Sequence, residues 1–449
     1  DSAKFGTREN NKSSPYELAE PSRDFYTDTM LQNAKEFSNT AIIVLSRNGG
    51  ENIGEIPLTQ SLRTEKGTET DNSRTYLEIT KEEDELLSMV TTNFDKVIVI
   101  VNCANAMKLD FLDRYENIDA CLYMAGTGQS GTHAIPRVLR GKVTPSGKLT
   151  NTSPYDFALD PTYANYTGSN RSITYAENIY LGYKWFETAD KENYFKDLSV
   201  TYDVLEENGK THQETKKGYD AAVKFPFGFG LSYTEFEWEI ESFTSTSEYI
   251  TKDTEFTYEV IVTNVGNRKG KDVVELYVTP PYTKGGIEKS SANLVAFGKT
   301  AELKPGQSQT LKLSFNAYDM ASYDCYDKNS NGFTGYELEP GNYEIKFMMD
   351  SHNLKNCENN ILTYKVESVG ENIGITYKMD PKTRQFVKNR MTGESAYLDL
   401  PVDGSSVNTA SYMTRSDFAT SFPTEHAKNP TSDGGKATKI NDVYDTNTM

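Results

Sequence analysis

One acidic residue stands directly after a glycine-rich turn, in the sequence IIVLSRNGGE that ends at Glu51. The apolar residues 42–45 are typical of a buried strand. Arg47, Asn48 and two glycines then turn the backbone sharply. A strand end that leads into such a loop commonly holds a catalytic side chain above a cleft, so Glu51 is a candidate general acid or base. A solvated loop glutamate is the alternative interpretation.

The sequence around this turn alternates between helices and short apolar strands. Residues 29–41 predict a helix, and a second helix begins after Thr80, whose hydroxyl is a good N-cap ahead of several acidic residues. The apolar runs 96–103 and 119–126 predict two further strands. This alternation is typical of a parallel α/β sheet with both faces covered. Ligands of such sheets bind at the carboxyl ends of the strands, which is where Glu51 falls.

Two other segments contain residue types that are common in binding sites. The corner 125–131 (AGTGQSG) contains glycines at the GxGxxG spacing, but it does not follow a first strand and no GK[ST] follows, so it does not predict nucleotide binding. Residues 165–235 are aromatic and irregular. We expect Tyr180, Tyr183 and Trp185 to pack a domain junction, with stacking on sugar as the alternative.

Beyond residue 236 the apolar pattern changes to period 2. Alternating runs separated by Gly, Pro and Asn turns predict an antiparallel β-sandwich of roughly a hundred residues. The runs are TEFTYEVIVTNVG, KDVVELYVTPP, LVAFGKTAEL, QTLKLSFN and GNYEIKFMM.

Residues 327–339 (DKNSNGFTGYELE) begin like a calcium-binding loop. The twelfth position is Leu338, however, where an EF-hand has a glutamate. We therefore favour a long hairpin turn, with calcium binding as the alternative.

The composition narrows the class of partner. The net charge of −18 argues against a nucleic acid or an anionic membrane and favours a neutral ligand such as a sugar. No apolar run is long enough for a transmembrane helix. Four cysteines and four histidines occur without CxxC or zinc spacing, so the sequence predicts no metal site and no cofactor. Cys103 and Cys121 are expected to be buried thiols.

Seven motifs follow one another along the chain: SR-N-GGE, AGTGQSGTHAIPRVLRGKVTPSGKLTNTSP, ITYAENIYLGYKWFET, FPFGFGLSYTEFEW, VTNVGNRKGKDVVELYV, LKPGQSQTLKLSF and LEPGNYEIKF. Their sequence and order, over about residues 35–365, resemble glycoside hydrolase family 3, which includes β-glucosidases and β-xylosidases. The resemblance implies an α/β sandwich domain followed by a fibronectin type III-like β-sandwich. The expected fold class is therefore α/β plus all-β.

The resemblance also implies a retaining mechanism with two carboxylates roughly 5 Å apart. In this family the nucleophile is an aspartate on a (β/α)8 barrel, and the acid/base is a glutamate on a sandwich-domain loop, which matches Glu51. It would protonate the leaving oxygen and then activate water, so it must stay protonated near neutral pH. Glu55 is the nearest rival and matches nothing in the pattern. Members often place an acid and a basic or amide residue after the acid/base, whereas Asn52, Ile53 and Gly54 follow here, which puts the leaving-group contacts in doubt.

The barrel is absent from this sequence. The segment YMTRSDFATSFP resembles the connector of members with permuted domain order, in which the barrel follows the fibronectin-like domain. Four regions are expected, in chain order: an α/β sandwich domain incomplete at its start (1–190), an aromatic connector (191–236), the fibronectin type III-like sandwich (237–368) and an extended strap (369–449). The strap would lead to a barrel on the same polypeptide, or the barrel would come from a partner chain.

These expectations describe part of a retaining exo-β-glycosidase, with β-glucosidase favoured and a β-glycoside or oligosaccharide as substrate. Because the family's barrel builds most of the sugar pocket, this chain does not distinguish glucose from xylose or N-acetylglucosamine. A homo-oligomer is a possible assembly, and a cytoplasmic location is favoured. One alternative is a non-catalytic carbohydrate-binding or scaffolding module. Another is a hydrolase that uses the α/β domain alone, although no GxSxG motif is present.

Overall fold

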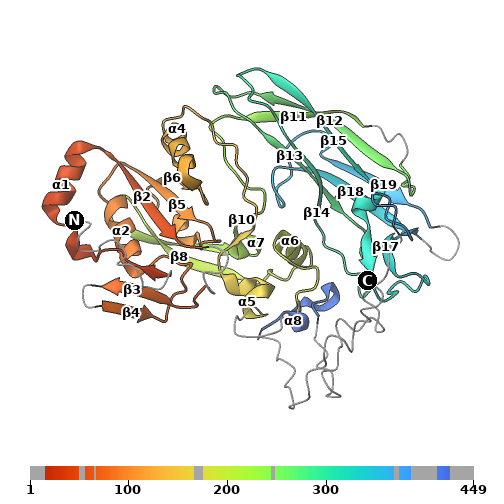
Figure 1. Cartoon of the computed structure of the whole chain (residues 1–449), viewed down its shortest axis with the longest axis horizontal. Coiled ribbons are helices and arrows are strands. Elements are labelled where there is room, and N and C mark those ends of the chain that lie inside the picture. The colour runs from red at the N-terminus through yellow and green to blue at the C-terminus, as the bar shows by residue number, and fades with distance from the viewer. Residues whose placement is uncertain are drawn as a thin grey trace, which may run out of the picture.

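The computed structural model describes residues 16–49, 56–64, 67–165, 175–243, 248–368, 374–385 and 412–424. An α/β body and a β-sandwich lie next to each other (Figure 1). Three helices lie between them: α6 (Tyr183–Lys191), α7 (Tyr219–Ala222) and α8 (Phe418–Ser421).

The α/β body is built on a parallel sheet of three strands in the order β2-β5-β6. These strands are β2 (Thr40–Arg47), β5 (Lys96–Cys103) and β6 (Ile118–Tyr123). They confirm the three strands predicted from the apolar runs. The central strand β5 is the most deeply buried, and its Val97, Val99 and Val101 are fully buried.

Helix α2 (Lys81–Thr91) covers one face of this sheet. Its Leu87 and Val90 pack with Ile43 and Leu45 of β2 and with the valines of β5. The helix begins with a capping box, in which the Thr80 hydroxyl accepts a hydrogen bond from the backbone N–H of Glu83 (3.0 Å) and the Glu83 carboxylate accepts one from that of Thr80 (2.8 Å). The predicted N-cap is thus confirmed. Helix α1 (Asp28–Phe37) precedes β2, also as predicted.

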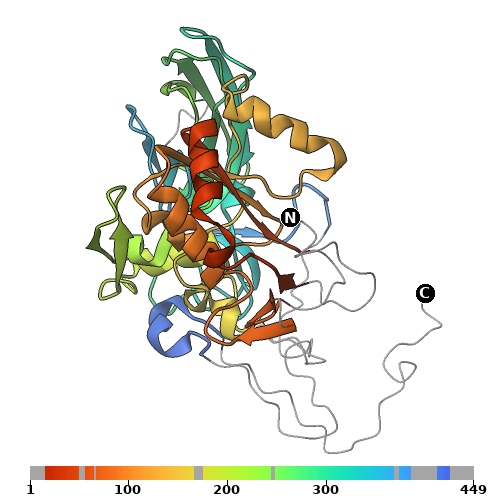
Figure 2. The same ribbon diagram turned by 90° about the vertical axis from the view of Figure 1, so that its left-hand side faces the viewer.

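Among the described residues the opposite face of the sheet is only partly covered, which corrects the expectation that both faces are covered: Ile100 of β5 is buried there, but the neighbouring strand β2 is not. Ile42 and Val44 of β2 are 53 % and 56 % exposed. Helix α4 (Ile135–Leu139) lies on the opposite side of the sheet from α2 (Figure 2), but it is five residues long and none of them is buried. Cys103 is a buried thiol as expected, whereas Cys121 is exposed because it lies on the edge strand β6.

Smaller elements surround the main sheet. A three-stranded sheet precedes α2, a β-hairpin follows α6, and a two-stranded sheet lies near α7. Their bounds are β1 (Glu17–Leu18), β3 (Gln60–Thr64) and β4 (Gly67–Asp71); β8 (Ser199–Leu205) and β9 (Thr211–Lys217); β7 (Ser153–Pro154) and β10 (Val223–Phe225); with helices α3 (Gly128–Gly131) and α5 (Pro161–Asn165).

The β-sandwich consists of two antiparallel sheets, ordered β11-β12-β15 and β14-β13-β18-β19. Alternate side chains of each sheet, such as Tyr258 and Val260 on β12 and Ile345 and Phe347 on β18, form one shared core. All five alternating runs form strands as predicted. The bounds are β11 (Phe236–Phe243), β12 (Glu255–Asn264), β13 (Val273–Thr279), β14 (Asn293–Lys299), β15 (Ser308–Asn316), β18 (Gly341–Met348) and β19 (Ile361–Val366).

A small third sheet contains the segment that resembles a calcium loop. Strands β16 (Ser322–Asp324) and β17 (Gly335–Leu338) pair antiparallel, and β17 also pairs with β20 (Ile375–Tyr377). The Asp327 carboxylate accepts hydrogen bonds from the backbone N–H of Gly332, and Asn329 donates to Glu337 at 3.0 Å. These groups serve the turn, which confirms the hairpin interpretation.

The junction between the two bodies is aromatic. Trp185 and Tyr180 are fully buried there, and Tyr183 packs on Tyr277 of the sandwich. They therefore fill the junction, as the sequence predicts. Residues 412–424 lie against the same cluster, with Met413 and Phe418 buried.

Candidate active site

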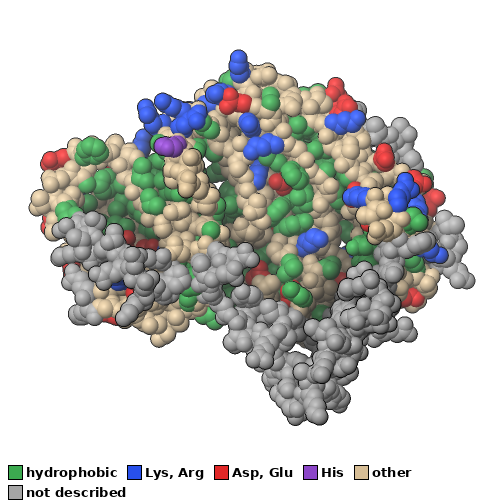
Figure 3. Space-filling model, in the orientation of Figure 1, with side chains coloured by type: hydrophobic (Ala, Val, Ile, Leu, Met, Phe, Trp, Pro, Cys, Tyr) green, Lys and Arg blue, Asp and Glu red, His purple; other side chains and the backbone are tan. Residues whose placement is uncertain are grey.

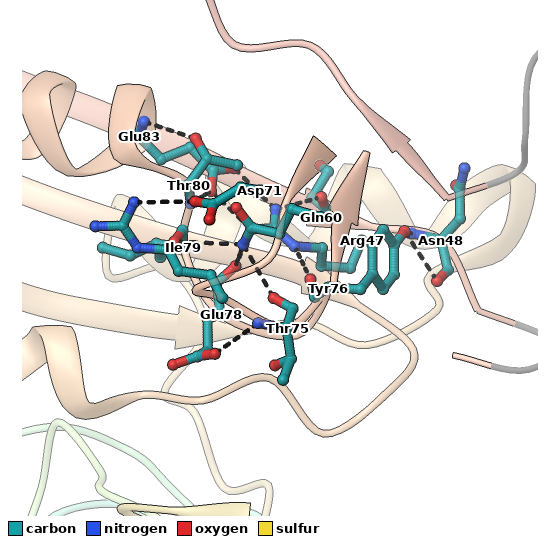
Figure 4. Close-up of polar contacts among 12 residues, drawn as sticks. Arg47, Asn48, Gln60, Asp71, Thr75, Tyr76, Glu78, Ile79, Thr80 and Glu83 are labelled. Carbon is teal, nitrogen blue, oxygen red and sulfur yellow. Dashed lines mark hydrogen bonds and ion pairs between the residues drawn. The ribbon is translucent and has the colours of Figure 1, made fainter. Parts of the chain in front are cut away.

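The carboxyl end of β2 is fixed by a buried ion pair. The guanidinium of Arg47 donates two hydrogen bonds to the carboxylate of Glu83, with Nη1–Oε1 at 2.8 Å and Nη2–Oε2 at 2.7 Å. Because Glu83 is also part of the capping box of α2, one carboxylate joins the strand end to the helix start (Figure 4). Two parallel hydrogen bonds between a guanidinium and a carboxylate fix the relative orientation of the two groups as well as pairing their charges.

The remaining donors of Arg47 are also used within the protein. Its Nε donates to the carbonyl of Tyr76 (2.7 Å), Nη2 donates to that of Glu78 (2.5 Å) and Nη1 donates to that of Ser46 (2.9 Å). The side chain is buried. Arg47 thus anchors the loop, and all of its N–H donors are used within the protein.

Two side chains hold the backbone of Asn48, the first residue after β2. The Tyr76 hydroxyl accepts a hydrogen bond from the Asn48 N–H (2.7 Å) and lies 3.2 Å from its carbonyl, to which it donates. Asn105 donates from Nδ2 to the same carbonyl at 3.0 Å. Both polar groups of the Asn48 backbone are therefore fixed where the glycine-rich turn begins.

The first glycine of the turn packs closely against the side chain of Asn105. A Cβ atom on Gly49 would lie 2.4 Å from the side-chain amide of Asn105, which is closer than real carbon atoms approach. Any other residue here would displace Asn105 or the turn. The two candidate acids, Glu51 and Glu55, lie outside the described residues, and so do Asn52, Ile53 and Gly54.

The ends of the neighbouring strands complete this arrangement. Asn105 follows β5, and its carbonyl accepts hydrogen bonds from the Cys103 thiol (3.0 Å) and from the hydroxyl of Tyr123, the last residue of β6. All three parallel strands thus contribute to one polar cluster at their carboxyl ends. This is the edge at which open α/β sheets bind their ligands.

Two titratable groups beside the start of the turn are uncharged near neutral pH. Burial raises the pKa values of the Tyr76 hydroxyl and the Cys103 thiol, so both remain protonated. The charge of Arg47 is balanced by Glu83.

The sequence patterns described above single out neither Tyr76 nor Asn105. Asn105 follows the second predicted strand, so the rule that ligand sites form at strand ends would have selected it. Tyr76 lies in the loop before α2, and no pattern in the sequence brings it to residue 48.

No three His, Cys, Asp or Glu side chains in the described parts of the chain are grouped as metal ligands. Over the same parts, the helices are all too short or too polar to cross a lipid bilayer.

Comparison with protein families identifies both bodies. Residues 18–183 match the glycosyl hydrolase family 3 C-terminal domain, and residues 272–351 match the fibronectin type III-like domain. The chain is 32 % identical over 333 residues to a β-glucosidase of Ruminococcus albus, covering 74 % of this chain and 29 % of that protein. It is 29 % identical over 392 residues to β-glucosidase A of Butyrivibrio fibrisolvens, covering 83 % and 42 %.

A solved structure has the same fold. The β-glucosidase of Paenibacillus barengoltzii matches 77 % of this chain and 33 % of its own, with a TM-score of 0.57 and 31 % identity. The chain therefore spans less than half the length of these relatives. The two matched domains, in this order, together with the β-glucosidase relatives, show that this chain belongs to glycoside hydrolase family 3.

Proposed function

We propose that this chain is part of a retaining exo-β-glucosidase and that Glu51 is its general acid/base. An aspartate nucleophile would come from a (β/α)8 barrel on the same polypeptide or on a partner chain. The observation that carries the proposal is the fixed turn: Arg47, Asn48 and Gly49 are held at the carboxyl end of β2, two residues before Glu51. The β-glucosidase relatives support the same class of reaction.

The proposed chemistry follows from the two roles of one carboxyl group. Protonated Glu51 donates its proton to the glycosidic oxygen while the barrel aspartate attacks the anomeric carbon and forms a glycosyl-enzyme intermediate. The resulting carboxylate then takes a proton from water, which attacks that intermediate and releases the sugar. The negative charge of the nucleophile keeps the pKa of Glu51 high in the first step, and its loss on glycosylation lowers the pKa for the second.

The test is the leaving-group dependence of a Glu51→Gln variant of a protein that contains both this chain and its barrel. With an alkyl β-glucoside, kcat/KM should fall about 10²- to 10⁴-fold, because the leaving alkoxide needs a proton. With 2,4-dinitrophenyl β-glucoside, kcat/KM should change little, because that leaving group departs without protonation. Sodium azide should raise kcat with this second substrate, because azide attacks the intermediate without a general base.

Glu55→Gln is the matched control, since it makes the same change four residues further on. It should leave both substrates within a few-fold of the parent protein. If Glu55→Gln showed the leaving-group dependence instead, Glu55 would be the acid/base. If neither variant changed turnover, a carbohydrate-binding or scaffolding role for this chain would replace the catalytic one.

A further inference from the structure

The charge of this acidic protein is unevenly distributed. Residues 120–155 contain no Asp or Glu but four Lys and Arg residues: Arg137, Arg140, Lys142 and Lys148. A second basic segment, residues 266–271 with the sequence GNRKGK, lies in the turn before β13. In a chain with a net charge of −18, two such segments are unexpected.

The fold brings these two segments together at the edge of the junction. Arg268 donates from Nη1 to the carbonyl of Gly141 (3.4 Å), and the Thr144 hydroxyl donates to the carbonyl of Lys269 (2.5 Å). Lys299, the last residue of β14, donates from Nζ to the carbonyl of Ser146 (2.6 Å). Residues 140–148 thus form one cationic surface with residues 266–271 and Lys299, which lie more than a hundred residues further along the chain.

We define the basic face as Arg140, Lys142, Arg268, Lys269, Lys271 and Lys299, all of which are exposed. In the space-filling view, blue side chains gather above α4 and continue onto the neighbouring edge of the sandwich (Figure 3). Lys269 pairs with Glu302 at 2.8 Å, whereas the nitrogen contacts of Arg268 and Lys299 are with backbone carbonyls.

The cations of this face repel one another. Burial lowers the pKa of Lys299, and the charges of Lys271 and Lys148 lower it further, although Asp272 acts in the opposite direction. A negatively charged ligand on this face would relieve that repulsion.

We propose that the basic face binds a carboxylate-bearing polysaccharide and so holds the protein on an acidic glycan. Phe297 indicates that sugar is part of the ligand. Its side chain is 68 % exposed, and it lies two residues before Lys299 on β14, on the same side of the strand. An exposed aromatic ring beside cations can stack on a sugar ring while the cations pair with its carboxylates. The choice of a polysaccharide over other polyanions rests on the proposed function.

The test measures binding by the 449-residue chain and needs no turnover, so its outcome is independent of Glu51. Polygalacturonate is the probe, its fully methyl-esterified form is the neutral control, and poly-glutamate is a polyanion without sugar. Polygalacturonate should bind at about 20 mM salt and dissociate by about 500 mM, because the Debye length shortens. The methyl ester should not bind, and poly-glutamate should bind more weakly than polygalacturonate.

Substitutions separate the contribution of the cations from that of the Phe297 ring. The triple variant Arg140→Gln, Lys142→Gln, Lys271→Gln should bind polygalacturonate about tenfold more weakly or worse, since three charge contacts are lost. The triple variant Lys196→Gln, Lys210→Gln, Lys217→Gln removes the same charge from exposed lysines elsewhere and should bind within about twofold of the parent. Phe297→Ala should weaken binding to polygalacturonate several-fold and leave poly-glutamate binding unchanged.

Several outcomes would overturn the proposal. Equal losses in the two triple variants would mean that net charge alone sets binding. Equal affinity for polygalacturonate and poly-glutamate, with no effect of Phe297→Ala, would rule out recognition of sugar. Absence of binding to polygalacturonate, together with self-association that the first triple variant abolishes, would make the basic face a contact between two copies of the chain.

Discussion

Arg47 and Glu83 lie 36 residues apart in the sequence and form a buried ion pair with two hydrogen bonds, of 2.8 and 2.7 Å. One Glu83 oxygen also accepts the backbone N–H of Thr80, so the same carboxylate caps α2. The position of the turn before Glu51 and the start of α2 are therefore set by the same group. A substitution of either Arg47 or Glu83 should therefore disturb both the turn after β2 and the start of α2.

Glu83→Gln should strongly destabilise the α/β body. It leaves the buried Arg47 guanidinium without a countercharge, which typically costs about 3–5 kcal/mol. Urea unfolding followed by circular dichroism measures the free energy of unfolding. Glu85→Gln is the control, because its pair with Lys81 is exposed and 3.6 Å long, and it should cost under about 1 kcal/mol. Equal costs for the two variants would contradict a structural role for the Arg47–Glu83 pair.

Gly49→Ala should disturb the turn because its Cβ would lie 2.4 Å from the Asn105 side chain. We expect a loss of about 1–3 kcal/mol in the free energy of unfolding, typical of overpacking. In the barrel-bearing protein, kcat/KM for alkyl β-glucosides should fall as well. Gly126→Ala is the matched control, since a Cβ there meets nothing within 4 Å, and it should change both quantities little.

Asn105→Ala tests whether the clash with the Asn105 side chain causes the loss of stability in Gly49→Ala. On its own it removes the hydrogen bond to the Asn48 carbonyl and should cost about 1 kcal/mol. Combined with Gly49→Ala, it also removes the atoms that the new Cβ would meet, so the double variant should lose less stability than the sum of the two single ones. Strict additivity would mean that Gly49 is constrained by something other than Asn105.

The sequence was most informative where a local pattern decides the structure. The apolar run 96–103 forms β5 with the same bounds, and Thr80 caps α2 as its hydroxyl and the following acids predict. The exposure of Ile42 and Val44 could not be predicted, because such residues have the composition of a covered strand whether or not anything packs on them. Tyr76 reaches Asn48 only through the tertiary fold, and such a contact leaves no periodic signal.

The cluster around His352 should make stability depend on pH. The ring donates from Nδ1 to the buried Glu187 carboxylate at 2.8 Å and stacks on Tyr219, so it joins the sandwich to α6 and α7. Burial alone would lower the pKa of His352, but the hydrogen bond and charge of Glu187, with Asp190 and Asp350, raise it above 6.5.

The direction in which stability changes with pH follows from this raised pKa. The stabilisation from protonated His352 is fully present below about pH 6.5 and is lost as pH rises through the folded-state pKa. The difference in free energy of unfolding between the parent chain and His352→Gln should therefore shrink as the pH rises above about 6.5. In a Glu187→Gln background that trend should weaken, because Glu187 makes the largest contribution to the raised pKa while Asp190 and Asp350 remain. A difference that stays constant with pH in the parent background would show that the ring acts only by packing.

Removing the Phe418 side chain should release the segment 412–424 from the junction. Phe418 lies edge-on to Trp185 and Tyr180, with ring centroids 5.0 and 4.9 Å apart, and it is almost fully buried. Phe418→Ala should weaken the docking of the segment by about 3–5 kcal/mol. Hydrogen exchange of residues 412–424 should then become much faster, while exchange in the sandwich core stays slow. Leu231→Ala, at a position that is 74 % exposed, is the control and should leave exchange unchanged.

Arg415→Lys tests the polar half of the same attachment. The Arg415 guanidinium lies 4.1 Å from the ring centroid of Tyr282, pairs with Glu192 at 2.8 Å and donates to the carbonyl of Lys289 at 2.9 Å. Lysine keeps the charge but loses the flat, multiply donating group, so it cannot satisfy all three partners at once. We expect intermediate protection of the segment, between that of the parent chain and that of Phe418→Ala. If residues 412–424 exchanged as slowly in Arg415→Lys as in the parent chain, the positive charge at residue 415 would be sufficient for docking. The shape of the guanidinium would then not matter, and the aromatic contacts of Phe418 would provide the specific fit of the segment.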